Sequence, residues 1–122
     1  HGLENKIKFL GEINRKKVFE YLKESTLFIL LSRNETFGLS YLEAMAAMNI
    51  VIGTKNDGID GILKNGVNSF LISQNSDELN KCIKNIIKMK DSELEDIYSN
   101  IKLTVKNSKI SDAARKYLQN LQ

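Results

Sequence analysis

Short apolar runs alternate with amphipathic segments along most of the chain. Four runs have the length and composition of β-strands, and turn residues or polar residues close each of them. These runs are 7–10, 26–31, 50–54 and 69–72. The run at 26–31 is typical of a strand buried on both faces of a parallel sheet, because it is apolar without interruption. The run at 50–54 predicts another central strand, and 69–72 predicts an edge strand.

Helical patterns separate these runs. Asn14 is expected to cap the first helix, and Asn75 with Glu78 three residues later resembles a capping box that opens a later one. The other expected helical segments are a helix over 38–48, one turn over 59–63, and two helices that begin at Ser92 and Ser111. Alternating strands and helices predict right-handed βαβ units, and therefore an α/β domain with a Rossmann-like, doubly wound parallel sheet. Because four strands are few for such a sheet, one or two more are expected to precede residue 1.

Composition limits the classes of protein. The chain has 122 residues, of which 42% are hydrophobic and 27% charged, as in one ordinary globular domain. A mixed net charge of +3 gives no support for nucleic-acid binding, and one cysteine excludes an internal disulfide. No apolar run is long enough to span a membrane, and no signal peptide opens the chain. The absence of an initial methionine suggests a part of a longer polypeptide. The single cysteine fits a reducing setting such as the cytoplasm.

The turn between the second strand and the following helix carries the candidate chemistry. Gly38 stands at the expected helix start, where backbone N–H groups have no partner and the helix dipole favours an anion. Glu35 precedes this start, and Glu43 lies inside the helix. The turn and the loop over 53–58 both follow strands at the edge where open α/β sheets bind ligands. An anion site beside two carboxylates suits a ligand with phosphates and hydroxyls, such as a nucleotide sugar.

Several motifs together resemble one known family. They are Ser32, Glu35-x-Phe37-Gly38 and Leu42-Glu43-Ala44-Met45-Ala46, then Phe9-Leu10-Gly11, and the stretch from Gly58 through Gly66-Val67-Asn68-x-Phe70-Leu71. The first set is similar to the E-x7-E segment of group-1 (family 4) retaining glycosyltransferases, which have the two-domain GT-B fold. The resemblance covers roughly residues 6–90. It implies that residues 1–122 are a partial C-terminal, nucleotide-sugar-binding domain, with 92–122 as its helical extension.

The resemblance also implies roles for individual residues. Glu35, the candidate catalytic residue, would bind hydroxyls of the donor sugar, and Glu43 would accept hydrogen bonds from the ribose hydroxyls without requiring a positive neighbour. The other residues expected to contact the substrate are Thr36, Phe37, Gly38, Leu39 and Ser40 at the helix start, Gly11 and Ile13 around the base, and Gly58 in the second loop. The backbone N–H groups at the helix start would meet the sugar and its pyrophosphate.

The implied reaction is transfer of a sugar from a nucleotide-diphosphate sugar to a glycan, polysaccharide or lipid-linked acceptor, with retention at the anomeric carbon. The resemblance implies neither a metal nor a cofactor. It places an arginine and a lysine that bind the diphosphate before residue 1, and an acceptor-binding N-terminal domain beyond them. The 122 residues alone are therefore expected to bind donor weakly and not to turn over. The full enzyme is expected in the cytoplasm, with peripheral association at the inner face of the membrane as an option.

Two other classes of function remain open at this point. One is a non-catalytic flavodoxin-like or receiver-type module, although the expected strand ends lack the acidic cluster of receivers. The other keeps the GT-B fold with different chemistry, as in nucleotide-sugar epimerases or phosphorylases.

Several residues also have simpler, structural explanations. Glu43 could be a solvated acid, Glu35 could complement the helix dipole, and Tyr41 could pack inside the domain instead of stacking on a base. Cys82 is expected in the core rather than as a nucleophile. Met48 stands where the family's helix often ends in glycine.

Overall fold

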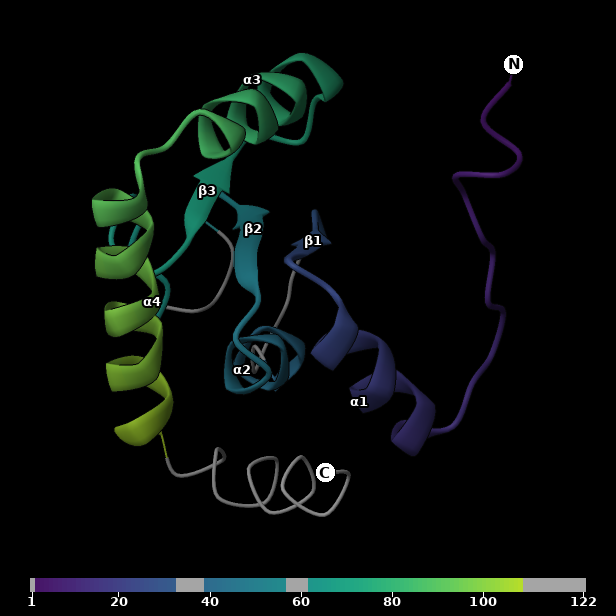
Figure 1. The fold of residues 1–122 in the computed structure, drawn as a ribbon, viewed down its shortest axis with the longest axis horizontal. Helices are drawn as coiled ribbons and strands as arrows, with labels where there is room; N and C mark the ends of the chain where they lie inside the picture. The colour runs from purple at the N-terminus through teal and green to yellow at the C-terminus, as the bar shows by residue number, and fades with distance from the viewer. Residues whose placement is uncertain (1, 33–38, 57–61, 109–122) are drawn as a thin grey trace.

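The computed structural model describes residues 2–32, 39–56 and 62–108. In these residues a parallel sheet of three strands is surrounded by four helices (Figure 1). The strands are β1 (Leu27–Leu30), β2 (Ile50–Thr54) and β3 (Phe70–Ile72). The helices are α1 (Arg15–Glu24), α2 (Leu39–Ala46), α3 (Ser76–Ile87) and α4 (Asp91–Lys106). This architecture confirms the predicted α/β class.

The strand order is β1-β2-β3, so β2 is central. Ile50, Val51 and Ile52 in β2 are at most 1% exposed. The predictions of a central strand over 50–54 and an edge strand at β3 are therefore confirmed. The prediction that 26–31 is buried on both faces is wrong, since β1 pairs only with β2 among the described residues and its Ile29 is 41% exposed.

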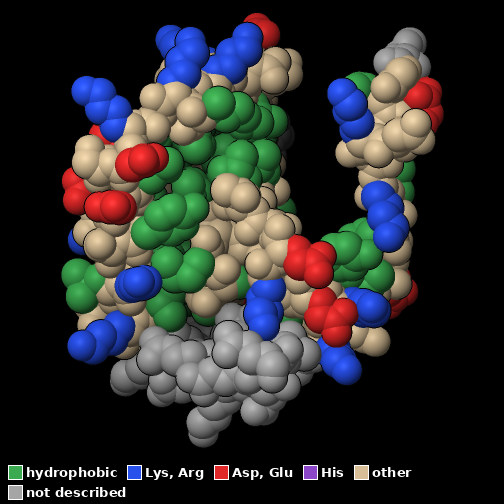
Figure 2. Space-filling view, viewed as in Figure 1, with side chains coloured by type: hydrophobic (Ala, Val, Ile, Leu, Met, Phe, Trp, Pro, Cys, Tyr) green, Lys and Arg blue, Asp and Glu red, His purple; other side chains and the backbone are tan. Residues whose placement is uncertain are grey.

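The strand expected at 7–10 does not form. Phe9 is 94% exposed and Ile7 is 52% exposed. The N-terminal segment runs apart from the sheet in Figure 1, and open space separates it from the body of the domain in Figure 2. A strand needs a neighbour to pair its backbone N–H and C=O groups, and no described strand lies beside this segment. The alternating pattern of 7–10 is therefore not sufficient to form a fourth strand here.

Two of the predicted helix caps are present. The Asn14 side chain accepts a hydrogen bond from the Lys17 amide at 2.9 Å, and the Asn75 side chain accepts one from the Glu78 amide at 2.7 Å. Glu78 does not complete the capping box at Asn75, because its Oε2 accepts from the Ser73 amide instead. That hydrogen bond, and next the charge of Lys55, lower the pKa of Glu78.

The later helices agree partly with the predictions. Helix α4 begins at Asp91, one residue before the expected start at Ser92, whereas 57–61 and Ser111 lie outside the described residues. Three residues of α4 are buried in the core, namely Ile97, Ile101 and Val105. The region expected as a C-terminal extension thus begins with a helix that contributes to the core.

Helix α3 supports the expected core role of Cys82. This residue is half-buried and packs against the core, and burial raises the pKa of its thiol. A raised pKa makes the thiolate scarcer, which does not favour nucleophilic chemistry.

Tyr41 in α2 is a structural residue. It is 1% exposed, its hydroxyl donates to the carbonyl of Leu30 at 2.7 Å, and its ring meets Phe28 edge-on at 6.1 Å. Tyr41 therefore packs helix α2 against β1 and is not available to stack on a ligand. Its ring also lies over Gly53, where a Cβ atom would be 3.2 Å from the Tyr41 hydroxyl.

The contact between Tyr41 and Gly53 gives a prediction. Gly53→Ala should lower the free energy of unfolding by about 1–3 kcal/mol, because the new methyl group overpacks a buried ring. In a Tyr41→Leu background the same change should cost much less. Urea unfolding of the four variants measures this coupling, and an equal cost in both backgrounds would show that Tyr41 is not the obstacle.

Helix α2 ends in a left-handed residue that is not glycine. Met48 has φ = 64°, and its amide donates to Met45 while the Asn49 amide donates to Ala44. This is the hydrogen-bond pattern of a Schellman motif, in which the left-handed position usually carries glycine. The departure from the family pattern at Met48 is therefore accommodated with backbone strain.

A matched pair of variants tests this strain. Both Met48→Gly and Met48→Ala remove the same packing, so their difference reports the backbone. Met48→Gly should be the more stable of the two by about 1 kcal/mol, since only alanine has a Cβ that opposes the left-handed conformation. Thermal or urea unfolding measures the stability of both variants. If Met48→Ala is as stable as Met48→Gly or more stable, the backbone at this position is not strained.

Candidate functional site

The carboxyl ends of β1 and β2 lie at the same edge of the sheet. The strands are parallel, and Leu30 is paired with Gly53. The segments that leave this edge begin at Leu31 and Lys55. The prediction that both suspected loops start from one edge is confirmed for the strand ends, while residues 33–38 and 57–61 themselves lie outside the described residues.

The predicted site residues divide into three groups. Outside the described residues lie Glu35, Thr36, Phe37, Gly38 and Gly58. On helix α2 lie Leu39, Ser40 and Glu43. Gly11 and Ile13 belong to the segment that leads into α1.

Helix α2 contributes both its N-terminal end and the carboxylate of Glu43 to the candidate site. Leu39 and Ser40 are its first two residues, and Leu39 is 42% exposed. The amides of a first helical turn have no partner within the helix, and they carry the positive end of its dipole. This geometry is suited to binding an anion such as a phosphate.

Glu43 lies on the same helix and is largely buried. Its side chain is 15% exposed, and its Oε1 accepts a hydrogen bond from Nη2 of Arg15 at 2.5 Å. Glu43 is therefore not a solvated surface acid. The ribose role predicted for Glu43 requires no positive neighbour, yet the structure supplies one.

The segment that was expected to read the base, with Gly11 and Ile13, leads directly into helix α1. Gly11 has φ = 63°, a conformation that side chains rarely adopt, and Ile13 is half-buried. Asn14 then caps α1, whose first residue is Arg15. The ion pair with Arg15 thus joins the beginning of α1 to Glu43 in α2.

Two residues of this region, Gln74 and Arg15, were not expected from the sequence. Gln74 follows β3, and its Nε2 donates to the carbonyl of Leu31, which follows β1, at 2.7 Å. This bond spans the end of the central strand. No motif indicated Gln74, whereas Arg15 could have been found as a cation beside the segment expected to read the base.

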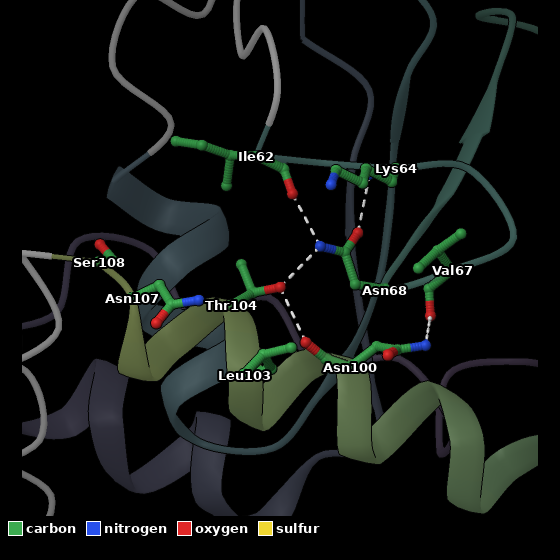
Figure 3. Close-up of a pocket in the computed structure, with 9 residues that line it drawn as sticks. All are labelled: Ile62, Lys64, Val67, Asn68, Asn100, Leu103, Thr104, Asn107 and Ser108. Atoms are coloured by element: carbon green, nitrogen blue, oxygen red, sulfur yellow. Dashed lines mark hydrogen bonds between the residues drawn. The ribbon is translucent and has the colours of Figure 1, made fainter.

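A pocket elsewhere in the domain has a structural explanation. It has a volume of about 520 Å³ and lies between the 62–68 loop and α4 (Figure 3). Asn68 is 2% exposed in its wall; its Nδ2 donates to the carbonyl of Ile62 and to Oγ1 of Thr104, at 2.7 and 2.8 Å. Its Oδ1 accepts from the Lys64 amide. Asn68 therefore fastens the loop to α4, and none of the predicted site residues that the structure describes lines this pocket.

Two further observations concern the whole described part of the chain. Across residues 2–32, 39–56 and 62–108, no group of three His, Cys, Asp or Glu side chains could hold a metal ion. No helix in the same residues has the length and apolar character needed to cross a membrane.

The fold and the site define a class of protein, an α/β domain of Rossmann-like type with its candidate ligand site at the carboxyl edge of a parallel sheet. The family model described as "Glycosyl transferases group 1" matches residues 1–104. The chain belongs to this family, which confirms the resemblance and favours it over a receiver-type module.

Curated relatives are similar over part of the chain. One is N-acetyl-alpha-D-glucosaminyl L-malate synthase of Bacillus anthracis, 41% identical over 57% of this chain and 18% of the relative. Another is the lipopolysaccharide core biosynthesis mannosyltransferase LpcC of Rhizobium leguminosarum bv. viciae, 43% identical over 43% of this chain and 14% of the relative. A third is 2-deoxystreptamine N-acetyl-D-glucosaminyltransferase of Niallia circulans, 35% identical over 69% of this chain and 23% of the relative. The chain spans less than a quarter of the length of each.

A solved structure is similar in fold. The C-terminal domain of the group 1 glycosyl transferase LpcC from Francisella tularensis superposes with a TM-score of 0.67 at 24% identity. The match covers 84% of this chain and 51% of that one. The described sheet and helices therefore have the fold of a C-terminal glycosyl transferase domain, as predicted.

Proposed function

We propose that this chain is the donor-binding domain of a two-domain GT-B glycosyltransferase. The enzyme transfers a sugar from a nucleotide-diphosphate sugar to a glycan, polysaccharide or lipid-linked acceptor, with retention at the anomeric carbon. The observation that carries the proposal is Glu43, a carboxylate only 15% exposed on the helix that starts at the candidate ligand edge, in a chain of the group 1 family. A largely buried acceptor of this kind suits the hydroxyl donors of ribose.

The proposed site divides the donor among four groups of residues. Glu43 binds the ribose, the amides of the first turn of α2 meet the pyrophosphate, and the main chain near Gly11 and Ile13 reads the base. Glu35 binds the hydroxyls of the sugar. Stabilising the leaving diphosphate is an electrostatic task, to which the start of α2 contributes through its unpaired amides and its dipole.

The rest of the enzyme is part of the same proposal. An acceptor-binding domain and the cations that oppose the diphosphate lie outside these 122 residues, so the isolated chain binds nucleotide weakly and does not turn over. The complete enzyme works in the cytoplasm or at the inner face of the membrane. The names of the relatives include a mannosyltransferase and an N-acetyl-D-glucosaminyltransferase.

Nucleotide binding by the chain itself tests this proposal. Uridine, guanosine and adenosine diphosphates are titrated into the ¹⁵N-labelled chain, and the amide resonances are followed. At least one nucleotide should shift the amides of residues 39–43. If millimolar concentrations of all three leave these amides unmoved, the site is assigned wrongly.

A further inference from the structure

We propose that Arg15 is a positioning residue that orients the Glu43 carboxylate toward the ribose and so sets the preference for ribonucleotides. The inference rests on the proposed function, since it assumes that Glu43 meets the ribose. Its basis is the ion pair between Nη2 of Arg15 and Oε1 of Glu43, with side-chain exposures of 67% and 15%. Arg15 touches no ligand in this proposal and acts through Glu43.

The ion pair leaves acceptor capacity for a ligand. Arg15 binds Oε1, and it is the one partner of this carboxylate among the residues that the structure describes. Each carboxylate oxygen has two lone pairs, so Oε2 and part of Oε1 remain available for the two hydroxyl donors of a ribose. By fixing one oxygen, the guanidinium restricts rotation of the carboxylate and directs the other oxygen.

Arg15 is itself held in place. Its guanidinium carbon lies 5.4 Å from the centre of the Phe19 ring, and Phe19 is fully buried. Arg15 is the first residue of α1 and directly follows the cap at Asn14, so its backbone has a helical conformation. A guanidinium restrained on an aromatic face loses less conformational freedom when it binds a carboxylate. The buried ring and the cap thus give Arg15 a defined direction toward Glu43.

The stability of the domain does not explain this placement. The first turn of α1 contains no acidic residue and begins with Arg15, Lys16 and Lys17, although a helix start disfavours cations. An ion pair with one largely exposed partner contributes little to folding. The position of Arg15 is explained better by what it does to Glu43, at the junction between the base-reading segment and the ribose.

The test compares ribonucleotides with their deoxy analogues. Dissociation constants are measured for uridine, guanosine and adenosine diphosphates and for the 2′-deoxy and 3′-deoxy forms, in the unaltered chain, Arg15→Met, Arg15→Lys and the control Lys16→Met. Lys16 is the neighbouring exposed cation, so its replacement makes the same change of charge. Amide spectra verify that each variant is folded.

A deoxy analogue lacks one hydroxyl and therefore loses a hydrogen bond to a charged group. The unaltered chain and Lys16→Met should consequently bind the ribonucleotide about 10-fold more tightly than the deoxy form. In Arg15→Met this preference should fall to about 2-fold or less, with Arg15→Lys in between, because lysine keeps the charge but not the planar geometry. An indirect loss of stability would weaken ribo and deoxy forms equally and leave the ratio unchanged.

Three outcomes overturn the inference, and they differ. If Arg15→Met keeps the full preference, Arg15 does not position Glu43. If the unaltered chain binds ribo and deoxy forms equally, Glu43 does not bind the ribose. If no nucleotide binds to the unaltered chain, the proposed function itself fails.

Discussion

Replacing Glu43 with glutamine is expected to weaken binding of a nucleoside diphosphate by about 10-fold or more, because a charged acceptor is lost from a largely buried position. The glutamine amide keeps the shape of the side chain but replaces one acceptor oxygen by a donor, which cannot accept from a ribose hydroxyl. Isothermal titration or amide shifts measure the dissociation constant.

In the complete enzyme, Glu43→Ala and Glu35→Ala should both lower donor turnover well below the unaltered rate.

A matched control separates the site from the surface. Glu20 in α1 forms an ion pair with Lys17 at 3.2 Å, and Glu20→Gln makes the same chemical change away from α2. This variant should bind nucleotide as the unaltered chain does. If Glu43→Gln also binds normally, the ribose role of Glu43 is refuted.

Replacing Asn68 with alanine is expected to lower the free energy of unfolding by about 3 kcal/mol, as several buried polar groups lose their partner. The carbonyl of Ile62, the amide of Lys64 and the hydroxyl of Thr104 all bond to this one side chain, which is 2% exposed (Figure 3). Asn68→Asp should also be destabilising, since a carboxylate cannot donate to the carbonyl of Ile62 or to Oγ1 of Thr104. Urea unfolding followed by circular dichroism gives the values.

The control for this prediction lies in the same pocket. Asn107 is exposed and ends α4, so Asn107→Ala should change stability by about 0.5 kcal/mol or less. A loss for Asn68→Ala no larger than that of Asn107→Ala would show that the loop is not fastened through Asn68.

Features encoded by a few neighbouring residues could be predicted from the sequence. The caps at Asn14 and Asn75 depend on hydrogen bonds three residues along the chain, and both are present. The central strand β2 could be recognised from its continuous β-branched run. Such a run is typical of a strand that is buried on both faces, as β2 is. The family could also be recognised, since its motifs keep their order and spacing.

Features that depend on distant partners could not be predicted in the same way. The run at 7–10 has the pattern of a strand but no strand beside it among the residues that the structure describes, so pairing and not composition decided the outcome. The bond from Gln74 to Leu31 joins residues 43 positions apart, and that from Arg15 to Glu43 joins residues 28 apart. Neither pair has a local pattern that would identify it.

The structure of the chain with a bound nucleoside diphosphate would show directly whether Glu43 binds the ribose. We expect the ribose hydroxyls within about 3.2 Å of the Glu43 carboxylate and the phosphates at the start of α2. A nucleotide bound elsewhere, for example in the pocket beside Asn68, with Glu43 bonded to Arg15 but not to the ligand, would contradict it.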